Sequence, residues 1–595
     1  MFLDCFKNNG TPYLRICEGY RVKKDDGSFT VKRKTIKNLG PLSKFDDGKP
    51  DLLQRLRQQF KDQTLIIDGF DYNEYDSVNR EIVLKINTQN PPVLNPQNIG
   101  YFFCEDIYNY LNVADIFAKY KQFRNIEFDV YGITKMLVYS RIMKPESKKA
   151  SFEYGVNTLF PLTETNNLND VYRTLDVLNE CSEKIVNRMN LRISQSSFGR
   201  DDSLMFYDVT NYFFETEYGD DFRKKGVSKE HRPNPIVQMG LFIDKNGIPV
   251  SYKLFSGNTQ DKTTFSDVLD NDCFRNNDKK TVIVADNGMY SQYNFYKLLS
   301  NGNGYIISKS VKKSWNKIRD FALDETGYET VTNVSGEVVF KSKSFIEDCT
   351  VKSKSGETLS YKKKTVIFWS KKHYEKEKRD NLKFIEYLES CVDNPDKLKD
   401  KQRKSQEFLK ILQVDSKTGE IIKTKAVVQL VEEKIKKFQE TMGFYMIETS
   451  ETEMTDNEII EQYHGLSRIE DSFRVIKSDL EGRPVYVRTK EHINAHFLIC
   501  YIALVIIRLM QCKILKTQGK SLSSENGWEE GLPAERLKKA LFDYNVNFLV
   551  QDYYQIINCT DDQKLLNKAF GVEELSFPTG AQLRKFKTDI TSKPI

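Results

Sequence analysis

Three acidic residues that lie far apart in the sequence stand where a carboxylate is unusual. Asp208 lies inside the apolar and aromatic run 203–215, and Asp286 directly follows the apolar run 281–285. Glu470 lies on a predicted helical face that otherwise carries aromatic and aliphatic side chains. A carboxylate in a buried strand costs several kcal/mol unless a partner compensates it, and neighbouring carboxylates repel each other unless a cation sits between them. Brought together, the three acids would suit Mg²⁺ or Mn²⁺, which prefer oxygen ligands.

Each acid also has an ordinary structural interpretation. Asp208 could end a strand and cap the next turn, and Asp286 opens Asp-Asn-Gly, a common turn sequence. Glu470 could form a helix-surface ion pair with Arg474, four residues later. Asp261 is a rival carboxylate, but its place at the start of a predicted helix favours capping. The order of the surrounding elements favours a shared site.

Residues 201–310 are predicted to alternate strands and helices in the order βββαβαβ. The second and third strands form a hairpin through an Asn-Gly turn, and the fourth is typical of a strand buried on both faces. The predicted strands are 204–209, 236–243, 249–255, 281–285 and 305–308, and the helices are 262–269 and 292–299. This is the order of an RNase H-like sheet, in which the strand before Asp286 lies beside the strand that carries Asp208.

A later helix is predicted to supply the third acid. Thr455 and Glu458 have the spacing of a capping box at a helix start, and the Gly-Arg-Pro sequence at 482–484 ends the helix after about Leu480. Residues at spacings of three, four and seven share one face of this helix. They are Tyr463, Leu466, Glu470, Phe473, Lys477 and Leu480.

The amino-terminal segment carries the excess positive charge of the chain. Residues 1–45 hold ten Lys or Arg and four Asp or Glu, an excess of six that equals the net charge of the whole chain. Two strands are predicted to form a hairpin here through Asp25-Asp26-Gly27, with Lys32, Arg33 and Lys34 exposed. Such a face can follow a phosphate backbone, or it can simply be solvated.

The composition predicts a soluble, multidomain α/β protein of the reducing cytoplasm. The chain has 595 residues, 39% of them hydrophobic, and its ten cysteines include no Cys-x-x-Cys pair, so neither a disulfide framework nor a zinc site is expected. The amino terminus lacks the pattern of a signal peptide. The longest apolar run, 497–507, is shorter than the ~20 residues of a membrane span, so it predicts a core helix and no membrane partner.

We expect six regions along the chain. The stretch after residue 310 is rich in lysine and in short predicted strands, which indicates a β-rich insertion into the RNase H-like core. The regions are a basic β-hairpin expected to bind DNA (1–46), a mainly helical domain (47–200), the first part of the core (201–310), the insertion (311–454), the second part of the core with the glutamate (455–512) and a C-terminal helical region and tail (513–595).

Several motifs in this order resemble a known family. They are Tyr-Asp-Val-Thr at 207–210, Lys-Gly-Val-Ser-Lys-Glu-His-Arg-Pro at 225–233, the run 247–259 from Gly-Ile-Pro to Gly-Asn-Thr, Ala-Asp-Asn-Gly-Met at 285–289, and Ile-Glu-Asp-Ser-Phe-Arg at 469–474. Together they resemble DDE transposases of bacterial insertion sequences, and more narrowly the cut-and-paste group with an insertion domain before its glutamate. The resemblance covers roughly residues 200–510.

The resemblance implies a role for each acid. Asp208, Asp286 and Glu470 would be the catalytic residues and the ligands of two Mg²⁺ or Mn²⁺ ions, with Asp208 bridging them. The implied reaction is two-metal phosphoryl transfer, in which water or a 3′ hydroxyl attacks the scissile phosphate.

The family's signature helix also implies DNA contacts. Its pattern is Tyr, two residues, Arg, three residues, Glu, six residues, Lys, and the outer positions here are Tyr463 and Lys477. Leu466 replaces the arginine, so that Arg468 or Arg474 would have to make its phosphate contact. Tyr463 and Lys477, each two turns from the glutamate, would face the same DNA strand.

The implied function is cut-and-paste transposition. The protein would bind double-stranded DNA at terminal inverted repeats, cut there and join the element to target DNA, as a homodimer in the bacterial cytoplasm at the nucleoid. Two alternatives stay open. One is a structure-specific nuclease on the same RNase H-like sheet, and the other is a non-catalytic DNA-binding protein descended from a transposase.

Overall fold

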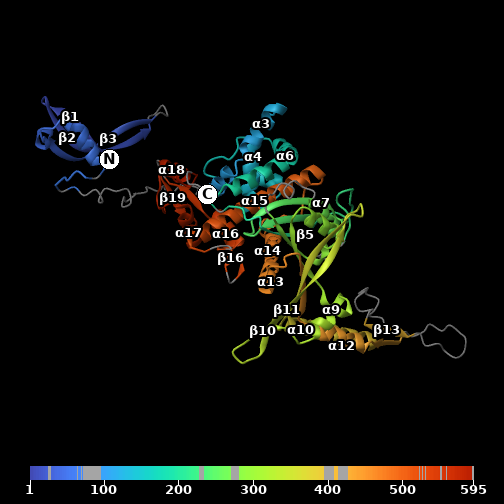
Figure 1. Ribbon diagram of the computed structural model, residues 1–595. Coiled ribbons are helices and arrows are strands. Elements are labelled where there is room, and N and C mark those ends of the chain that lie inside the picture. The colour runs from blue at the N-terminus through green and yellow to red at the C-terminus, as the bar shows by residue number, and fades with distance from the viewer. Residues whose placement is uncertain are drawn as a thin grey trace, which may run out of the picture. The chain divides into compact units, whose positions relative to one another are not determined.

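The computed structural model divides the chain into two compact units, Met1–Pro92 and Val93–Ile595 (Figure 1). The structure describes residues 1–23, 29–62, 64–68, 70, 95–197, 199–226, 233–269, 280–393, 408–412, 427–520, 523–524, 527–528, 531–549, 552–557 and 559–591. The predicted turn Asp25-Asp26-Gly27 and most of the motif at 225–233 lie outside these residues.

The first unit is a three-stranded antiparallel sheet with a helix packed on it. Its elements are β1 (Phe2–Asn8), β2 (Thr11–Lys23), β3 (Phe29–Pro41) and α1 (Leu52–Lys61). Leu14 and Ile16 of β2 share one buried core with Leu56 and Phe60 of α1. The unit therefore contains one strand more than the predicted hairpin, and its core extends past residue 46.

The three basic residues predicted to contact DNA lie on β3. All three side chains are exposed. Arg33 is also held within the unit, because its Nη1 lies 3.3 Å from Asp4 Oδ1 and its guanidinium lies 5.5 Å from the centre of the Phe2 ring. Lys32 and Lys34 therefore present the more available charges of this strand.

The second unit is built on a nine-stranded mixed sheet in the order β10-β11-β12-β15-β9-β8-β5-β6-β7. Its central strands are β5 (Leu204–Phe213), β6 (Ile236–Asp244), β7 (Pro249–Ser256), β8 (Val282–Ala285) and β9 (Gly304–Lys309). β5 pairs antiparallel with β6 and parallel with β8, and β8 pairs parallel with β9. The predicted RNase H-like order of these five strands is confirmed, including the adjacency of β5 and β8.

Alternate side chains of β5 face two separate cores, as the period of two in a strand requires. Phe206 and Tyr212 belong to the larger core, and Met205 and Tyr207 belong to the smaller one. The smaller core is covered by α7 (Asp261–Leu269) and α8 (Gln292–Ser300). By the same alternation, Asp208 faces the side of the larger core.

The long helix α15 (Lys490–Thr517) fills the larger core. The ring of Phe497 lies 4.6 Å from Tyr212 of β5, and the ring of Tyr501 lies 4.9 Å from Tyr252 of β7. Among the described residues, α15 is the one helix long and apolar enough to cross a membrane, and 94% of its most apolar window is buried inside the protein. The prediction of a core helix at 497–507 is confirmed.

Segments from both ends of the second unit form one helical layer. The earlier elements are β4 (Gln97–Asn98), α2 (Tyr101–Tyr110), α3 (Ala114–Arg124), α4 (Val130–Met143), α5 (Lys148–Tyr154) and α6 (Leu168–Ser194). The later ones are β16 (Ser523–Ser524), β17 (Gly527–Trp528), α16 (Ala534–Phe542), β18 (Asn545–Phe548), β19 (Tyr554–Ile557), α17 (Asp561–Phe570) and α18 (Gly580–Thr591). β4 pairs with β18, and Lys587 Nζ of α18 lies 2.7 Å from Glu105 Oε2 of α2.

The region predicted as an insertion extends the main sheet. Its elements are α9 (Asn316–Leu323), β10 (Glu329–Thr332), β11 (Val338–Lys352), β12 (Thr358–Ser370), α10 (Lys371–Asp393), β13 (Leu409–Leu412), β14 (Val427–Leu430), α12 (Glu432–Glu440) and β15 (Phe444–Thr449). β15 pairs with β9 and carries the long β11–β12 hairpin on its other edge. The prediction of short strands is wrong for this hairpin, because ion pairs such as Lys363 with Glu448 (3.2 Å) accommodate lysines within the strands.

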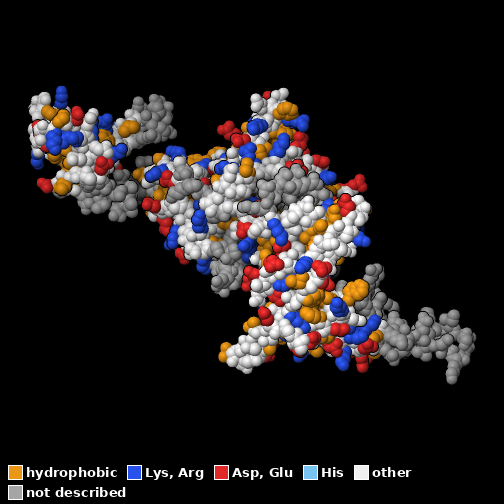
Figure 2. Space-filling view, viewed as in Figure 1, with side chains coloured by type: hydrophobic (Ala, Val, Ile, Leu, Met, Phe, Trp, Pro, Cys, Tyr) orange, Lys and Arg blue, Asp and Glu red, His pale blue; other side chains and the backbone are white. Residues whose placement is uncertain are grey.

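Charges of both signs are mixed on the surface of the molecule. Figure 2 shows Lys and Arg side chains interspersed with Asp and Glu over the face in view, in keeping with 90 basic and 84 acidic residues in the chain. Many exposed charges are paired locally, as Lys437 is with Glu433 at 2.7 Å. Total charge therefore does not mark a DNA path on this face, and a DNA contact has to be inferred from local groups.

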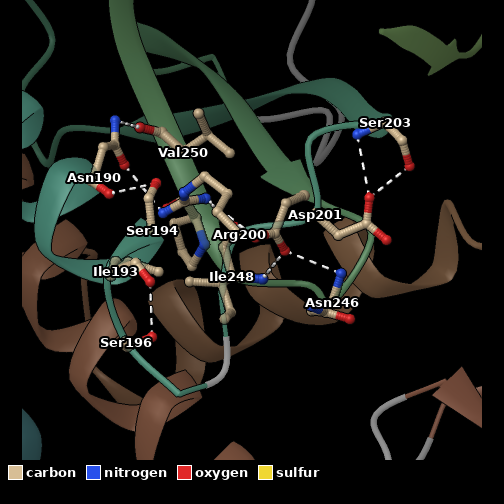
Figure 3. A network of polar contacts seen from close by, with 12 residues as sticks. Asn190, Ile193, Ser194, Ser196, Arg200, Asp201, Ser203, Asn246, Ile248 and Val250 are labelled. Carbon is tan, nitrogen blue, oxygen red and sulfur yellow. Dashed lines mark hydrogen bonds and ion pairs between the residues drawn. The ribbon is translucent and has the colours of Figure 1, made fainter. Parts of the chain in front are cut away.

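The turn between β6 and β7 is held by a buried ion pair. Arg200 Nη1 lies 3.2 Å from Asp244 Oδ2, and both side chains are buried. Asp244 Oδ1 accepts hydrogen bonds from the backbone N–H groups of Asn246 (3.0 Å) and Ile248 (2.9 Å). Arg200 Nη2 donates to Asn190 Oδ1 at 3.0 Å (Figure 3). The network joins the end of α6 to this turn.

We expect Arg200→Met to destabilise the protein by about 3–5 kcal/mol, because it leaves the Asp244 carboxylate buried without its cation. The double variant Arg200→Met/Asp244→Asn keeps an oxygen for the two backbone N–H groups and removes the charge, so it should recover most of the loss. Thermal unfolding midpoints of the two variants provide the measurement. A single variant that unfolds no earlier than the double variant would contradict the role of the pair.

Candidate active site

Asp208 and Asp286 stand side by side on neighbouring strands. β5 and β8 run parallel with Tyr207 opposite Ala285, so the next residue along each strand is also opposite its neighbour. Asp208 is half-buried within β5, and Asp286 is exposed just beyond the end of β8. The sheet therefore presents two carboxylates at one place, as predicted from the strand order.

Two hydrogen bonds orient the Asp286 carboxylate. Its Oδ1 accepts from the backbone N–H of Asn287 at 2.7 Å and from Ser308 Oγ of β9 at 2.7 Å. Donors to a charged carboxylate favour its ionised form and offset repulsion from a neighbouring acid. Sequence analysis missed Ser308, because only the strand order brings the end of β9 to the end of β8.

The helix that carries Glu470 begins where it was predicted, but it is not continuous. Thr455 Oγ1 accepts from the Glu458 N–H, and the Glu458 carboxylate accepts from the Thr455 N–H, which confirms the capping box. The helix is divided into α13 (Asp456–His464), α14 (Ser467–Arg474) and a π-helical turn η8 (Val475–Asp479). The prediction of one helix to Leu480 is therefore corrected to three segments.

Close packing on β5 accompanies the break between α13 and α14. The break begins at Gly465, where an added Cβ would lie 2.4 Å from the Phe206 ring. Phe206 precedes Asp208 by two residues on β5 and faces the same side of the sheet. The missing side chain of Gly465 thus lets the start of α14 approach the strand that carries Asp208.

Glu470 and its neighbour Asp471 have different surroundings. Asp471 Oδ2 accepts from Arg508 Nη2 of α15 at 2.6 Å, and Arg508 also donates to Ser472 Oγ at 3.0 Å. Burial acts to raise the pKa of Asp471, but Arg508 and Arg474 outweigh it and the pKa is lowered. Glu470 is exposed. Asp471 therefore anchors α14 to the core and leaves Glu470 at the surface.

The Tyr463 hydroxyl lies within range of the charges of all three acids. Burial raises the pKa of Tyr463 to about 12, a hydrogen bond with Ser308 opposes the shift, and the charges of Asp286, Glu470 and Asp208 add to it. Charge effects of this kind need short separations, so all three carboxylates lie near this hydroxyl. At neutral pH the hydroxyl keeps its proton and remains a hydrogen-bond donor.

The three carboxylates are chemically suited to bind a hard cation, but they do not lie close enough together to share one. Carboxylate oxygens are the ligands that Mg²⁺ and Mn²⁺ prefer. In the part of the chain that the structure describes, no three His, Cys, Asp or Glu side chains lie close enough together to hold a metal ion. The acids would have to move closer to share an ion, so the two-metal centre stays a prediction.

Comparison with known proteins identifies the region that holds this site. Residues 212–506 match the family model described as the transposase DDE domain. The chain contains a transposase DDE domain. The matched range includes Asp286 and Glu470 and begins four residues after Asp208. A DDE domain implies phosphoryl-transfer chemistry.

Two further comparisons complete the findings. No curated protein matches the chain. Among solved structures, the chain is similar to a piggyBac transposase synaptic complex with hairpin DNA, determined by cryo-EM, at 9% sequence identity and a TM-score of 0.30. The match covers 85% of this chain and 89% of that chain. A similarity of this size carries no functional argument.

Lys477 packs against the far half of the strand that carries Asp208. Its Nζ is 5.7 Å from the centre of the Tyr212 ring, and Tyr212 lies four residues after Asp208 on β5. The side chain is half-buried in the π-helical turn. Tyr463 thus lies within range of the charges of the three acids, and the DNA contact of Lys477 stays a prediction.

The two arginines proposed to replace the missing signature arginine are held by protein contacts. Arg474 pairs with Asp471 at 2.7 Å and with Asp479 at 3.0 Å. Arg468 donates to the backbone carbonyl of Lys245 in the β6–β7 turn, and burial lowers its pKa. Arg468 therefore links the DDE helix to the turn shown in Figure 3.

Asp261 lies beside the site, whereas sequence analysis assigned it to capping. It is the first residue of α7, and a Cβ added to Gly288 would lie 3.2 Å from its Oδ2. Gly288 follows Asp286 by two residues. Asp261 and Gly288 line a hollow of about 600 Å³, together with the amide side chains of Asn211, Gln238, Asn258 and Gln260. The crossover order could have indicated this, because α7 delivers the chain from β7 to β8.

We expect Gly465→Ala to destabilise the DDE domain by about 1–3 kcal/mol, the usual cost of overpacking, because the added methyl group meets the Phe206 ring. Thermal unfolding of the variant measures the effect. The double variant Gly465→Ala/Phe206→Leu provides room for the methyl group. Its loss of stability should therefore be smaller than the sum of the losses measured for the two single variants. Strictly additive losses would show that Gly465 and Phe206 do not limit each other.

Proposed function

We propose that this protein is the cut-and-paste transposase of a bacterial insertion sequence and that Asp208, Asp286 and Glu470 are its catalytic acids. The observation that carries the proposal is the match of residues 212–506, which include Asp286 and Glu470, to a transposase DDE domain, and the pairing of β5 with β8 sets Asp208 beside Asp286. The substrates would be double-stranded DNA with terminal inverted repeats and a target DNA. The reaction would be cleavage at the element ends followed by strand joining.

The side chains have distinct tasks in this proposal. Two Mg²⁺ or Mn²⁺ ions held by the three acids would neutralise charge on the scissile phosphate and activate the attacking water or 3′ hydroxyl. Ser308 and the N–H of Asn287 keep the Asp286 carboxylate oriented. On DNA binding the Tyr463 hydroxyl would exchange its hydrogen bond with Ser308 for one to a phosphate oxygen, and Lys477 would balance the negative charge of the phosphate.

We assign recognition of the DNA ends in part to the first unit. The support is the local excess of positive charge in residues 1–45 and the exposure of Lys32 and Lys34 on β3. The protein would act as a homodimer that bridges two element ends, in the bacterial cytoplasm at the nucleoid. The homodimer and the location at the nucleoid are proposed from the behaviour of the family that the motifs resemble.

We expect Asp208→Asn, Asp286→Asn and Glu470→Gln each to lower Mg²⁺-dependent cleavage of element-end DNA by about a hundredfold or more, because several kcal/mol of metal-assisted stabilisation are lost. DNA binding should change little. Glu461→Gln, which alters an exposed acid on α13, is the matched control and should cut normally.

The same assay separates the transposase from the two alternatives. A transposase joins the cut 3′ end to a target strand, whereas a structure-specific nuclease only cuts. A non-catalytic DNA-binding protein would bind the ends without metal-dependent cleavage. Full cleavage by any one of the three acid variants would remove that acid from the site.

We expect replacing Lys32, Arg33 and Lys34 together by Gln to weaken binding to element ends and to flatten its dependence on salt. Each lost phosphate contact should reduce the slope of log K against log salt by about 0.9. A control triple variant at Lys44, Lys49 and Lys61, which are also exposed in the first unit, removes the same charge elsewhere. Equal slopes for the two triple variants would argue against a DNA contact through β3.

A further inference from the structure

A cavity of about 320 Å³ in the second unit gathers basic side chains from segments that are distant in the sequence. Its polar lining comes from α4, from the start of α5 and from the loop and first turns of α15. These residues are Arg141, Ser147, Lys148, Arg488, His492 and His496. No Asp or Glu is among the described residues that line it.

Lys148 is the unusual member of this group, because it is only 5% exposed. Its Nζ lies 3.5 Å from Nδ1 of His496, which is its one hydrogen-bond partner among the described residues. His496 Nε2 lies 3.1 Å from the carbonyl of Gly482. A carbonyl only accepts, so Nε2 carries the proton and Nδ1 accepts from Lys148. Two of the three Lys148 donors are thus left for a group inside the cavity.

Neither Lys148 nor Arg141 has a hydrogen-bonded carboxylate among the described residues. Burial lowers the pKa of Lys148 well below its usual range and the neighbouring Arg141 lowers it further, so the ammonium form is disfavoured until an anion enters the cavity. Arg141 is itself buried, and it donates to three backbone carbonyls, those of Leu480 (3.2 Å), Glu481 (3.2 Å) and Glu146 (2.9 Å). Carbonyls bind a guanidinium without removing its charge.

Two carboxylates near the cavity are already paired, one with His492 of the lining and the other with Lys144 outside it. Asp176 Oδ1 lies 3.1 Å from His492 Nε2 at the rim, and Glu146 Oε1 lies 3.5 Å from Lys144 Nζ. Burying cations without a carboxylate is costly unless an anion from outside completes the site. The arrangement therefore indicates a site that an anion fills.

The cavity is connected to the segment that follows the Glu470 helix. Leu480, Glu481 and Gly482, which bind Arg141 and His496, come directly after the turn that carries Lys477. The guanidinium of Arg483 lies 5.8 Å from the ring of Phe213, at the end of β5. Residues 480–483 thus connect the cavity to the turn that carries Lys477 and to the end of β5.

We propose that this cavity binds a phosphate group of the DNA backbone, with Lys148 as its buried ligand and Arg488 at its mouth. A phosphodiester offers oxygen acceptors and a negative charge, which match the free donors of an ammonium and a guanidinium. The DNA source of the phosphate rests on the proposed function. A free phosphate ion has the same chemistry, so the test has one arm for each source.

The first arm uses inorganic phosphate and the full-length protein. At constant ionic strength, exchanging chloride for phosphate should raise the thermal unfolding midpoint of the wild-type protein, because a ligand that binds only the folded state stabilises it. Lys148→Met, which keeps the length of the side chain and removes its charge, should lose this response. Lys149→Met is the matched control, since Lys149 is the next residue and its side chain is 61% exposed.

The second arm uses a fluorescently labelled duplex and an Asp286→Asn background, in which the DNA stays uncut. Lys148→Met should weaken binding by about tenfold, the loss of one charge-assisted contact, and reduce the salt slope by about 0.9. Lys149→Met should change neither. Arg488→Gln, at an exposed residue, should weaken both the stabilisation by phosphate and the binding of the duplex. It serves as the second variant if Lys148→Met fails to fold.

The outcomes are distinct. Equal phosphate responses in the wild-type protein and in both cavity variants would overturn the site. Loss of the phosphate response with an unchanged salt slope would overturn the DNA assignment and leave a site for free phosphate. Because the first arm needs neither DNA nor cleavage, a failure of the proposed transposase activity would be seen separately, as wild-type protein that binds phosphate but neither binds nor cuts DNA.

Discussion

The parallel pairing of β5 with β8 is the constraint on which the rest of the site depends. It sets Tyr207 opposite Ala285 and therefore Asp208 opposite Asp286. A shift of one residue would turn every side chain of a strand to the other face of the sheet. That shift is prevented because both faces of β5 fill apolar cores, with Phe206 on one side and its neighbours on the other. Hydrophobic burial on two faces thus fixes where two carboxylates stand.

The third acid is placed by packing and by charge pairing, not by the sheet. Gly465 allows α14 to approach β5, and the Asp471–Arg508 pair ties α14 to α15. Buried ion pairs add little net stability in general, but removing one partner is costly, so such a pair holds one helix orientation against alternatives. Glu470, next to Asp471 and exposed, takes its position from that anchor.

Local pattern was sufficient to predict the central strand order, the start of the Glu470 helix at Thr455 and the core helix α15. It could not predict features whose cause lies far away in the sequence. The break at Gly465 depends on Phe206, and the position of Ser308 beside Asp286 depends on the pairing of β8 with β9. The long β11–β12 hairpin was not predicted because its lysines indicated breaks in the strands, and the acidic partners of these lysines lie on another strand. The metal role of the acids was predicted from the pairing of carboxylates and from family resemblance, and the structure supports the placement of Asp208 beside Asp286.

Two other buried cations of this protein have acidic partners, which distinguishes them from Lys148. Arg200 faces Asp244, and Arg508 faces Asp471, so each of these charges is balanced by the fold itself. The cavity around Lys148 has no Asp or Glu among the described residues that line it, and the proposed function assigns divalent ions to Asp208, Asp286 and Glu470. In the proposed complex, DNA bound together with divalent ions would supply the anion for the cavity and the cations for the three acids. Two sites that are each unfavourable in the free protein would then both be satisfied by one ligand, so binding energy from the cavity can help to draw the three acids together around the scissile phosphate.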